Sequence, residues 1–336
     1  MFEQENPVFI LGVPRSGTTL LRLLLNAHSK IAICGEIHFF DQVKEIQKRL
    51  PELNKDNLEQ FFSLLNNTYS LQKLTRKDEL FANVKKLLLK EEKISYEKFY
   101  LYLMQEYATL DNKKIIGEKT PQNIRYVNDI YKIFPNAKII HIIRDPRAAI
   151  ASMLKVDWTA NDVIINTLKW KIDILFSQEY EKNPLNFKEI HYEDLIKFPE
   201  KTLKELCDFI GVEYEKAILD FHKTAKQYIG NQPEKVNTFK PLSTDSLNKW
   251  KEQLSEEQIY IIEMLAGSYI QKLGYTKTKI KLKNKLFAPF VFLKELNEYI
   301  KYKKNDKLMR KNETPEIIYA DNDKLKSMLI KALLAR

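Results

Sequence analysis

The sequence predicts an α/β fold in which helices flank a parallel β-sheet. The first observation is a short apolar run at 8–11 that is followed by a glycine loop and by a leucine-rich stretch at helical spacing. The second is the recurrence of strand–loop–helix units further along the chain, a pattern typical of a parallel sheet covered by helices. The third is composition. Only 8 Gly and 12 Pro occur in 336 residues, and long Leu-, Lys- and Glu-rich stretches favour a helix-rich protein.

The first unit places a tight loop between its strand and its helix. Gly12 and Gly17 frame the loop as in nucleotide-triphosphate-binding loops, but Thr18 stands where that motif has its Lys. A strand, a glycine loop and a helix N-terminus together present backbone N–H groups and the positive end of a helix dipole, so we expect an anion site. The alternative is a structural turn without a ligand. The expected ligand is a phosphate ester, bound without the usual lysine and magnesium by Arg15, Ser16, Gly17, Thr18 and Thr19.

The second strand is expected at 31–33, and Glu36 and His38 follow it closely. In open α/β sheets, ligands collect beyond the carboxyl ends of the strands, so both side chains should lie near the phosphate loop. Residues 41–110 have the patterns of a helical insertion, in which Ser95 is expected to cap a helix. The Tyr and Phe residues of that helix are interpreted as core, with an acceptor-binding lid as the alternative.

A third strand is predicted at 114–117, and Glu118 and Lys119 follow it directly. Thr120 as N-cap and Pro121 at the first helical position predict that a helix starts there. Glu118 and Lys119 are therefore expected at a strand end, on the side of the sheet where ligands bind.

The clearest strand in the sequence lies at 137–143, and it leads through an Arg-Asp-Pro-Arg run into another helix. A further strand is predicted at 187–191, directly before Tyr192. Later in the chain a capping box at 255–258 opens a helix that Gly274 is expected to close.

The formal net charge of +10 is unevenly distributed. Residues 276–312 contain 12 Lys or Arg and 3 Asp or Glu, and the rest of the chain is close to neutral. The basic character therefore belongs to a C-terminal extension, and no nucleic-acid partner is expected for the domain. For this extension we consider attraction to anionic lipid, with a solvated arm or a helix packed on a second subunit of a homo-oligomer as alternatives.

The cysteine content and the hydropathy of the sequence indicate the cellular compartment in which we expect the protein. Cys34 and Cys207 make no disulfide framework, and no Cys/His cluster suggests a metal, so none is expected. No secretory signal and no run long enough to span a bilayer is recognised. The sequence thus favours a cytoplasmic protein, with peripheral contact to the inner face of the membrane through the basic extension.

The separate motifs occur in an order that resembles the sulfotransferases that use 3′-phosphoadenosine 5′-phosphosulfate (PAPS). This resemblance implies the P-loop-like sulfotransferase fold, with a sulfotransferase domain at 1–275 and a basic helical extension at 276–336. The spacing of the motifs is most similar to the tyrosylprotein and glycan-type branch, and we expect a soluble, bacterial-type member. The motif residues are Arg15-Ser16-Gly17-Thr18-Thr19, Glu36, Lys119, Arg144, Ser152 and Tyr192.

The resemblance implies a role for each nucleotide-binding residue. The loop at 15–19 is similar to the 5′-phosphosulfate loop of the family. Arg144 and Ser152, eight residues apart, are similar to its 3′-phosphate pair. Tyr192 and Lys249 lie in segments similar to those that contact the nucleotide.

The resemblance also implies a mechanism, in which the sulfuryl group moves from PAPS to an acceptor hydroxyl by in-line displacement. Glu36 would be the base, and His38 is the rival base. Arg15 and Lys119 would supply positive charge where negative charge develops in the transition state. Arg147 is interpreted as a supporting or surface charge.

Two other functions are weighed against this one. They are a phosphoryl-transfer enzyme with a P-loop and a non-catalytic nucleotide-binding protein on the same fold. The acceptor stays open among a glycan, a lipid or sterol-like alcohol and a phenol.

Overall fold

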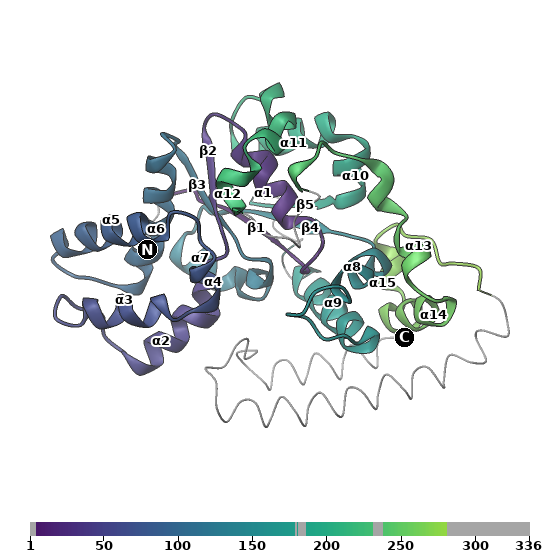
Figure 1. The fold of residues 1–336 in the computed structure, drawn as a ribbon, viewed down its shortest axis with the longest axis horizontal. Helices are drawn as coiled ribbons and strands as arrows, with labels where there is room; N and C mark the ends of the chain where they lie inside the picture. The colour runs from purple at the N-terminus through teal and green to yellow at the C-terminus, as the bar shows by residue number, and fades with distance from the viewer. Residues whose placement is uncertain (1–4, 179, 181–185, 231–237, 281–336) are drawn as a thin grey trace. The chain divides into compact units, whose positions relative to one another are not determined.

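The computed structural model describes residues 5–178, 180, 186–230 and 238–280 (Figure 1). The chain forms two compact units, which are described separately here. Unit 1 comprises the described residues of Met1–Gly12, Gly17–Ile142 and Tyr180–Leu242. Unit 2 comprises those of Val13–Ser16, Ile143–Glu179 and Ser243–Arg336.

Unit 1 is built on a five-stranded sheet with the strand order β2-β3-β1-β4-β5 (Figure 1). β1 pairs in parallel with both β3 and β4, and β2 pairs in parallel with β3. The predicted α/β class with a parallel sheet is therefore confirmed. The strands are β1 (Val8–Gly12), β2 (Ile31–Cys34), β3 (Ile115–Lys119), β4 (Lys138–Ile143) and β5 (Phe187–His191).

The central strand β1 is buried along its whole length, as expected for a parallel strand covered on both faces. Helices supply that cover. The α-helices of unit 1 are α1 (Thr18–Asn26), α2 (Lys44–Arg49), α3 (Leu58–Asn66), α4 (Tyr69–Gln72), α5 (Lys77–Lys90), α6 (Tyr96–Leu110), α7 (Val127–Ile133), α10 (Tyr192–Lys197), α11 (Pro199–Ile210) and α12 (Ala225–Ile229). Helices of other types also occur in the described part of unit 1, among them the π-helix η1 (Phe39–Val43) and the 3₁₀-helices η2 (Pro121–Tyr126) and η3 (Lys216–Lys223).

Helices η1 to α6 follow one another between β2 and β3. The side chain of Ser95 caps α6 by accepting from the N–H of Lys98, as its sequence position predicts. Phe61 packs edge-on against Phe99, and both rings are fully buried. Tyr96, Phe99 and Tyr107 of α6 are thus core, as interpreted from the sequence, because they are buried instead of facing solvent.

Two element boundaries differ from the predictions. β3 runs on through Glu118 and Lys119, because these residues pair with Phe9 and Ile10 of β1. The helix predicted to start at Pro121 begins instead as the 3₁₀-helix η2 and becomes α-helical only in α7. Its Thr120 makes no cap, since the hydroxyl is bonded to the Glu118 carboxylate.

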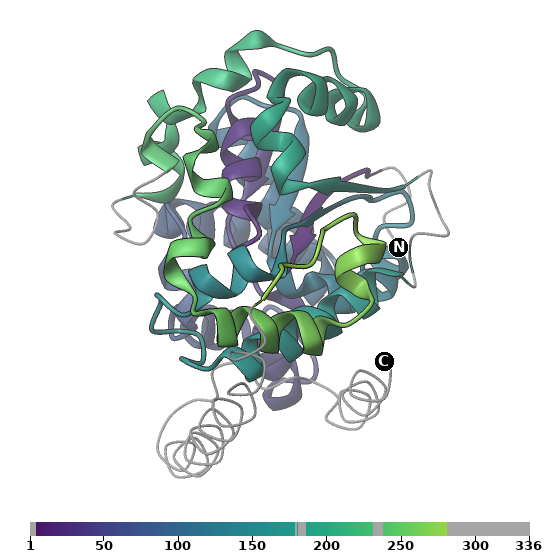
Figure 2. The ribbon, with the colours of Figure 1, turned by 90° about the vertical axis from the view of Figure 1, so that its right-hand side faces the viewer.

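Unit 2 is helical in its described part. Its helices are α8 (Pro146–Met153), α9 (Val163–Gln178), the 3₁₀-helix η5 (Thr244–Leu247), α13 (Trp250–Gln253), α14 (Glu256–Ala266) and α15 (Tyr269–Lys272). The capping box of Ser255 and Gln258 is present. The helix that it opens ends at Gly267, earlier than predicted, because Gly267 has a φ of 63° and α15 then starts as a separate helix (Figure 2).

A buried ionic cluster supports the start of α8. Arg147 is 4% exposed, and its guanidinium donates to Asp145 and, over 2.7 Å, to Glu263. The same guanidinium lies 4.4 Å from the ring centre of Trp250. Of the two interpretations of Arg147, a supporting or a surface charge, the structure therefore agrees with the first, a structural cation of the core.

The first residues of the basic region, 276–280, are described, and they pack against Arg147 and the apolar cluster of unit 2. Arg147 donates to the carbonyl of Thr276 and to the hydroxyl of Thr278, each over 3.0 Å, and Ile280 joins the apolar cluster of unit 2. The extension predicted from residue 276 lies beyond 280 outside the described residues. Its boundary, its helices and its membrane contact stay predictions.

We expect Glu263→Gln to lower the free energy of unfolding of unit 2 by about 2 kcal/mol, because a hydrogen bond between buried charged groups loses its charge. Tryptophan fluorescence during urea unfolding measures this, since the three tryptophans of the chain all belong to unit 2 (Trp158, Trp170 and Trp250). The control Glu252→Gln, at an exposed position of α13, should change stability by less than about 0.5 kcal/mol. Equal effects of the two substitutions would contradict the role of the cluster.

Candidate active site

The loop residue Arg15 joins two other predicted residues within unit 2. Its Nε donates to the hydroxyl of Ser152 over 3.0 Å. Its backbone carbonyl accepts from Nη1 of Arg144 over 2.9 Å. Arg15 has a φ of 68°, which is uncommon for a residue with a side chain and turns the loop sharply. Arg15, Arg144 and Ser152, which the sequence predicts for one nucleotide site, thus lie together.

The hydroxyl of Ser16 sits next to this cluster in the chain. Ser16 is fully buried, and its Oγ has no hydrogen-bond partner among the described residues. A buried hydroxyl without a partner is rare in folded proteins and calls for a ligand group. The neighbouring residue Arg15 carries a guanidinium, which favours an anionic group in that role.

In unit 1 the loop passes into α1 through Gly17. No side chain caps α1, and its first turn contains no acidic residue, so an anion is suited to its N–H groups. Thr18 is buried and Thr19 half-buried at this end of the helix. Of the loop residues predicted to bind phosphate, those at 17–19 therefore form the N-terminus of α1.

Tyr192 lies against the same glycine. A Cβ atom placed on Gly17 would come within 2.4 Å of Cδ2 of the Tyr192 ring. Tyr192 is the first residue of α10, directly after β5, and is buried. Tyr192, which is predicted to contact the nucleotide, therefore packs directly against Gly17 of the glycine loop.

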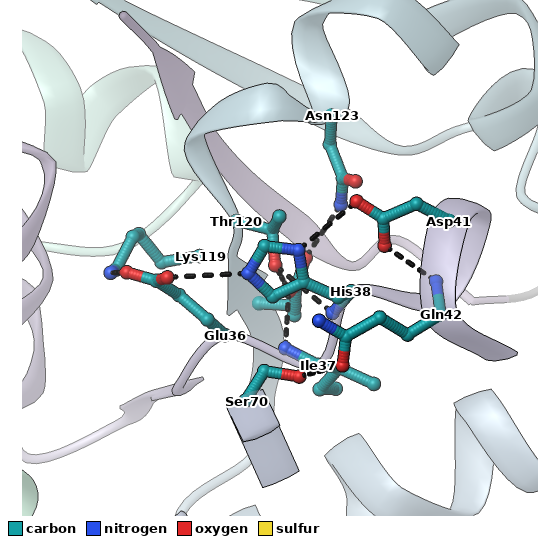
Figure 3. A network of polar contacts seen from close by, with 10 residues as sticks. Glu36, Ile37, His38, Asp41, Gln42, Ser70, Lys119, Thr120 and Asn123 are labelled. Carbon is teal, nitrogen blue, oxygen red and sulfur yellow. Dashed lines mark hydrogen bonds and ion pairs between the residues drawn. The ribbon is translucent and has the colours of Figure 1, made fainter. Parts of the chain in front are cut away.

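Glu36 and Lys119 form an ion pair at the ends of two neighbouring strands (Figure 3). Lys119 is the last residue of β3 and its side chain is 2% exposed, whereas the side chain of Glu36, in the loop after β2, is 36% exposed. Burial lowers the pKa of Lys119, and the Glu36 carboxylate acts in the opposite direction. A carboxylate that reaches solvent is thus held by a buried cation.

His38 contacts the same carboxylate from its other side. Nε2 of the ring lies 3.4 Å from Oε2 of Glu36, and Nδ1 lies 3.1 Å from Oδ2 of Asp41 (Figure 3). Burial by itself would lower the pKa of His38, but Asp41 and Glu36 outweigh it and raise that pKa to about 10. His38 is therefore an imidazolium at neutral pH, and both ring nitrogens carry a proton.

Glu118 anchors the loop that carries Glu36 and His38. Its buried carboxylate accepts from the N–H of Ile37 over 3.0 Å, from Asn123 over 2.9 Å and from the hydroxyls of Tyr100 and Thr120. Burial raises the pKa of Glu118 to about 7, although the bonds from Thr120 and Ile37 lower it. A Glu at the end of a short apolar strand is a sequence signal for such a buried acceptor. The sequence does not show which groups donate hydrogen bonds to it.

Lys249 is not brought to the other predicted site residues of unit 2. Lys249 is exposed and precedes α13 in unit 2. Within the described part of the chain, its side chain takes no part in the hydrogen bonds that join Arg15 to Arg144 and Ser152. The described residues also contain no group of three or more His, Cys, Asp or Glu that could hold a metal, and no helix long and apolar enough to cross a membrane.

Comparison with known proteins decides the family. The model of the sulfotransferase family matches residues 7–216, which is more than half of the chain. The chain belongs to the sulfotransferase family. It is therefore an enzyme that transfers a sulfuryl group, and the phosphoryl-transfer and non-catalytic alternatives are not favoured.

Relatives of this sulfotransferase have low sequence identity to it, but they align over most of this chain. It is 24% identical to protein-tyrosine sulfotransferase 2 of Gallus gallus over 82% of this chain and 71% of that protein. It is 27% identical to protein-tyrosine sulfotransferase 1 of Danio rerio over 82% of this chain and 74% of that protein. An uncharacterized protein of Aquifex aeolicus is 27% identical over 74% of this chain, which spans 30% of that longer relative.

Solved structures support the fold. The sulfotransferase domain of the Synechococcus PCC 7002 olefin synthase aligns with a TM-score of 0.55 at 23% identity, over 78% of this chain and 96% of that one. The sulfotransferase domain of the curacin biosynthetic pathway aligns with a TM-score of 0.55 at 21% identity, over 82% and 100%. The fold expected from the motifs is therefore the fold observed.

We expect Gly17→Ala to destabilise unit 1 more than Gly211→Ala. Both glycines have left-handed backbones, with φ of 97° and 92°, so each substitution incurs about 1–2 kcal/mol of backbone strain. Only at Gly17 would the new methyl group strike Tyr192, which adds at least about 1 kcal/mol. Denaturation followed by circular dichroism measures both, and equal losses would show that the ring does not press on the loop.

Proposed function

We propose that this sulfotransferase uses PAPS as its donor and Glu36 as the base that accepts the proton of an acceptor hydroxyl. The observation that carries the proposal is the Glu36 carboxylate, which is partly exposed and is contacted by one cation at each oxygen. Bound PAPS supplies an activated sulfuryl group. The residues of this chain bind the donor, orient the carboxylate and take up the proton.

The residues present fit such a polyanionic donor. The buried Ser16 hydroxyl lacks a partner among the described residues and offers a hydrogen bond to an anionic oxygen. Arg15 is hydrogen-bonded to both Ser152 and Arg144, so two arginines and a hydroxyl are gathered in unit 2. Guanidinium forks suit phosphate geometry, which supports the assignment of Arg144 and Ser152 to the 3′-phosphate.

Glu36 suits the role of base better than His38 does. A carboxylate beside two cations stays ionised at neutral pH and retains lone pairs for a proton, and a positioned general base contributes typically 10²–10⁴-fold to a rate. His38 already carries its proton at neutral pH, since its pKa is raised to about 10. The rival assignment of His38 as base is therefore not supported in the free protein.

Lys119 has a role that follows from its burial. Its ammonium group lies at the end of β3 and is held by Glu36. A fixed positive charge in a region of low dielectric stabilises negative charge that develops during transfer more strongly than an exposed one would. We assign this electrostatic role to Lys119, and we assign the same role to Arg15 from its place in the phosphate loop.

The acceptor is proposed as a hydroxyl compound. Several relatives are named protein-tyrosine sulfotransferases, which makes a phenolic hydroxyl the first acceptor to test. Glycan hydroxyls and lipid or sterol-like alcohols are the other two classes. Incubation of each class with PAPS, followed by mass spectrometry for one added sulfuryl group, identifies the acceptor.

Glu36→Gln is expected to lower sulfuryl transfer at least ~100-fold, because the amide cannot accept the proton. The same variant should keep its affinity for adenosine 3′,5′-bisphosphate, measured by calorimetry. Retention of full transfer activity by Glu36→Gln would remove Glu36 from the role of base.

Arg144→Ala is expected to weaken the binding of adenosine 3′,5′-bisphosphate by about 10–100-fold, because each hydrogen bond between charged groups contributes roughly 1.5–3 kcal/mol. The control is Lys272→Ala, which removes an exposed cation of the same unit and should leave the affinity unchanged. A change of less than about twofold for Arg144→Ala would argue against the 3′-phosphate assignment.

A further inference from the structure

The loop from Glu36 to Asp41 holds a buried imidazolium between two carboxylates. Nε2 of His38 faces Oε2 of Glu36 over 3.4 Å, and Nδ1 faces Oδ2 of Asp41 over 3.1 Å (Figure 3). The side chain of His38 is 7% exposed and that of Asp41 is 16% exposed, whereas that of Glu36 is 36% exposed. The imidazolium is therefore the most buried of the three groups, and the Glu36 carboxylate is the one that reaches furthest into solvent.

The backbone of His38 is set for this arrangement. Its φ of 53° lies in the left-handed region, which a residue with a side chain rarely adopts unless its surroundings impose it. Two consecutive N–H groups are tied to residues at the end of β3: that of Ile37 donates to Glu118 over 3.0 Å, and that of His38 donates to the hydroxyl of Thr120 over 3.3 Å. The sheet thus fixes the direction in which the ring leaves the backbone.

Asp41 is fixed as well, by the π-helix η1. Its Oδ1 accepts from the N–H of Gln42 over 2.7 Å, so Oδ2 is directed at the ring of His38. The side chain of Gln42 is in turn bonded to the hydroxyl of Ser70 on α4 (Figure 3). Single π-helical turns occur frequently at functional sites, where they redirect a side chain.

We propose that His38 is a positioning residue that holds the Glu36 carboxylate in its proton-accepting orientation and keeps it ionised, while Asp41 orients the ring of His38. This role rests on the proposed function of Glu36 as base. His38 makes and breaks no covalent bond in it. Glu36 takes the proton of the acceptor and later releases it to solvent, and His38 keeps both of its protons throughout.

Charged groups on each element that packs around His38 affect the protonation state of its ring. Glu36 and Asp41 face the ring from the loop and from η1, and Glu118 faces it from β3. Lys119 acts through Glu36, to which it is bonded. Asp41 and Glu36 outweigh the effect of burial, which by itself would lower the pKa of His38, and that pKa is therefore raised.

The role has a consequence for the pH dependence of transfer. The acidic limb of kcat/KM reports the pKa of the base in the free enzyme. Removal of a neighbouring positive charge makes ionisation of Glu36 less favourable, so the pKa of Glu36 rises by roughly one unit and the acidic limb moves to higher pH. A residue that only supports the fold would lower stability without moving this limb.

The test compares His38→Gln and Asp41→Asn with the control His28→Gln. His28 is also a buried histidine of unit 1 beside a carboxylate: its Nε2 lies 2.8 Å from the carbonyl of Glu213 and 3.7 Å from Glu215. Transfer from PAPS to a phenol is measured across pH. NMR of carbon-labelled glutamate follows the ionisation of Glu36 without substrate, with its signal assigned by its absence in Glu36→Gln.

We expect His38→Gln to lower kcat/KM at neutral pH about tenfold and to raise the midpoints of the acidic limb and of the Glu36 signal by about one unit. Asp41→Asn should shift both in the same direction by less, and His28→Gln should shift neither. If His38→Gln does not fold, as judged by circular dichroism, Asp41→Asn decides alone. Unchanged midpoints in both folded variants overturn the positioning role.

The outcome for Glu36→Gln separates this inference from the function on which it rests. Loss of transfer in Glu36→Gln together with unchanged midpoints in His38→Gln overturns the role of His38 only. Full transfer in Glu36→Gln overturns the proposed base, and the role of His38 in catalysis with it. NMR of nitrogen-labelled histidine adds a direct check, because a neutral His38 ring near neutral pH would also overturn the inference.

Discussion

The parallel pairing of β1 with β3 and β4 is the constraint on which the arrangement of unit 1 depends. Because parallel strands end at the same edge of a sheet, pairing in this register brings together the residues that follow different strands. β2 and β3 are neighbours in the same sheet, so the loop that carries Glu36 meets Lys119 at their common end. Residues that are 83 positions apart in the chain thereby form one ion pair.

Buried charge at this edge is kept in balance by specific partners. Lys119 and His38 are buried cations, and each contacts a carboxylate. Glu118 is a buried carboxylate, and four donors surround it. A buried charge without a partner is costly, whereas a network in which each member is satisfied becomes rigid and holds one geometry. Rigid support is what a base needs if it is to meet a hydroxyl in a productive orientation.

Sequence reasoning reached most of the fold because the strands are short apolar runs followed by polar strand ends. It placed Arg15, Arg144 and Ser152 in one site, and their side chains and backbone are in contact. It failed where long-range contacts override local preference. Thr120 and Pro121 have the residue types of a capped helix start, yet the hydroxyl of Thr120 is bonded to Glu118 and the helix begins as a 3₁₀ turn. The sequence left Arg147 open between a supporting and a surface charge, and only the contacts with Asp145, Glu263 and Trp250 place it in the core.

The sequence by itself determined the parallel α/β class, and it placed a glycine loop after the first strand and Glu36 and His38 after the second. These depend on local patterns: apolar runs of strand length, glycines that frame a loop, and polar residues directly after strands. Only the tertiary structure supports the proposal of Glu36 over His38 as the base. The state of a histidine depends on the charges around it, and the Asp41 contact and the burial that set the pKa of His38 come from a π-helix and a sheet edge that no local pattern shows. The difference between base and positioning residue is therefore a property of the folded chain.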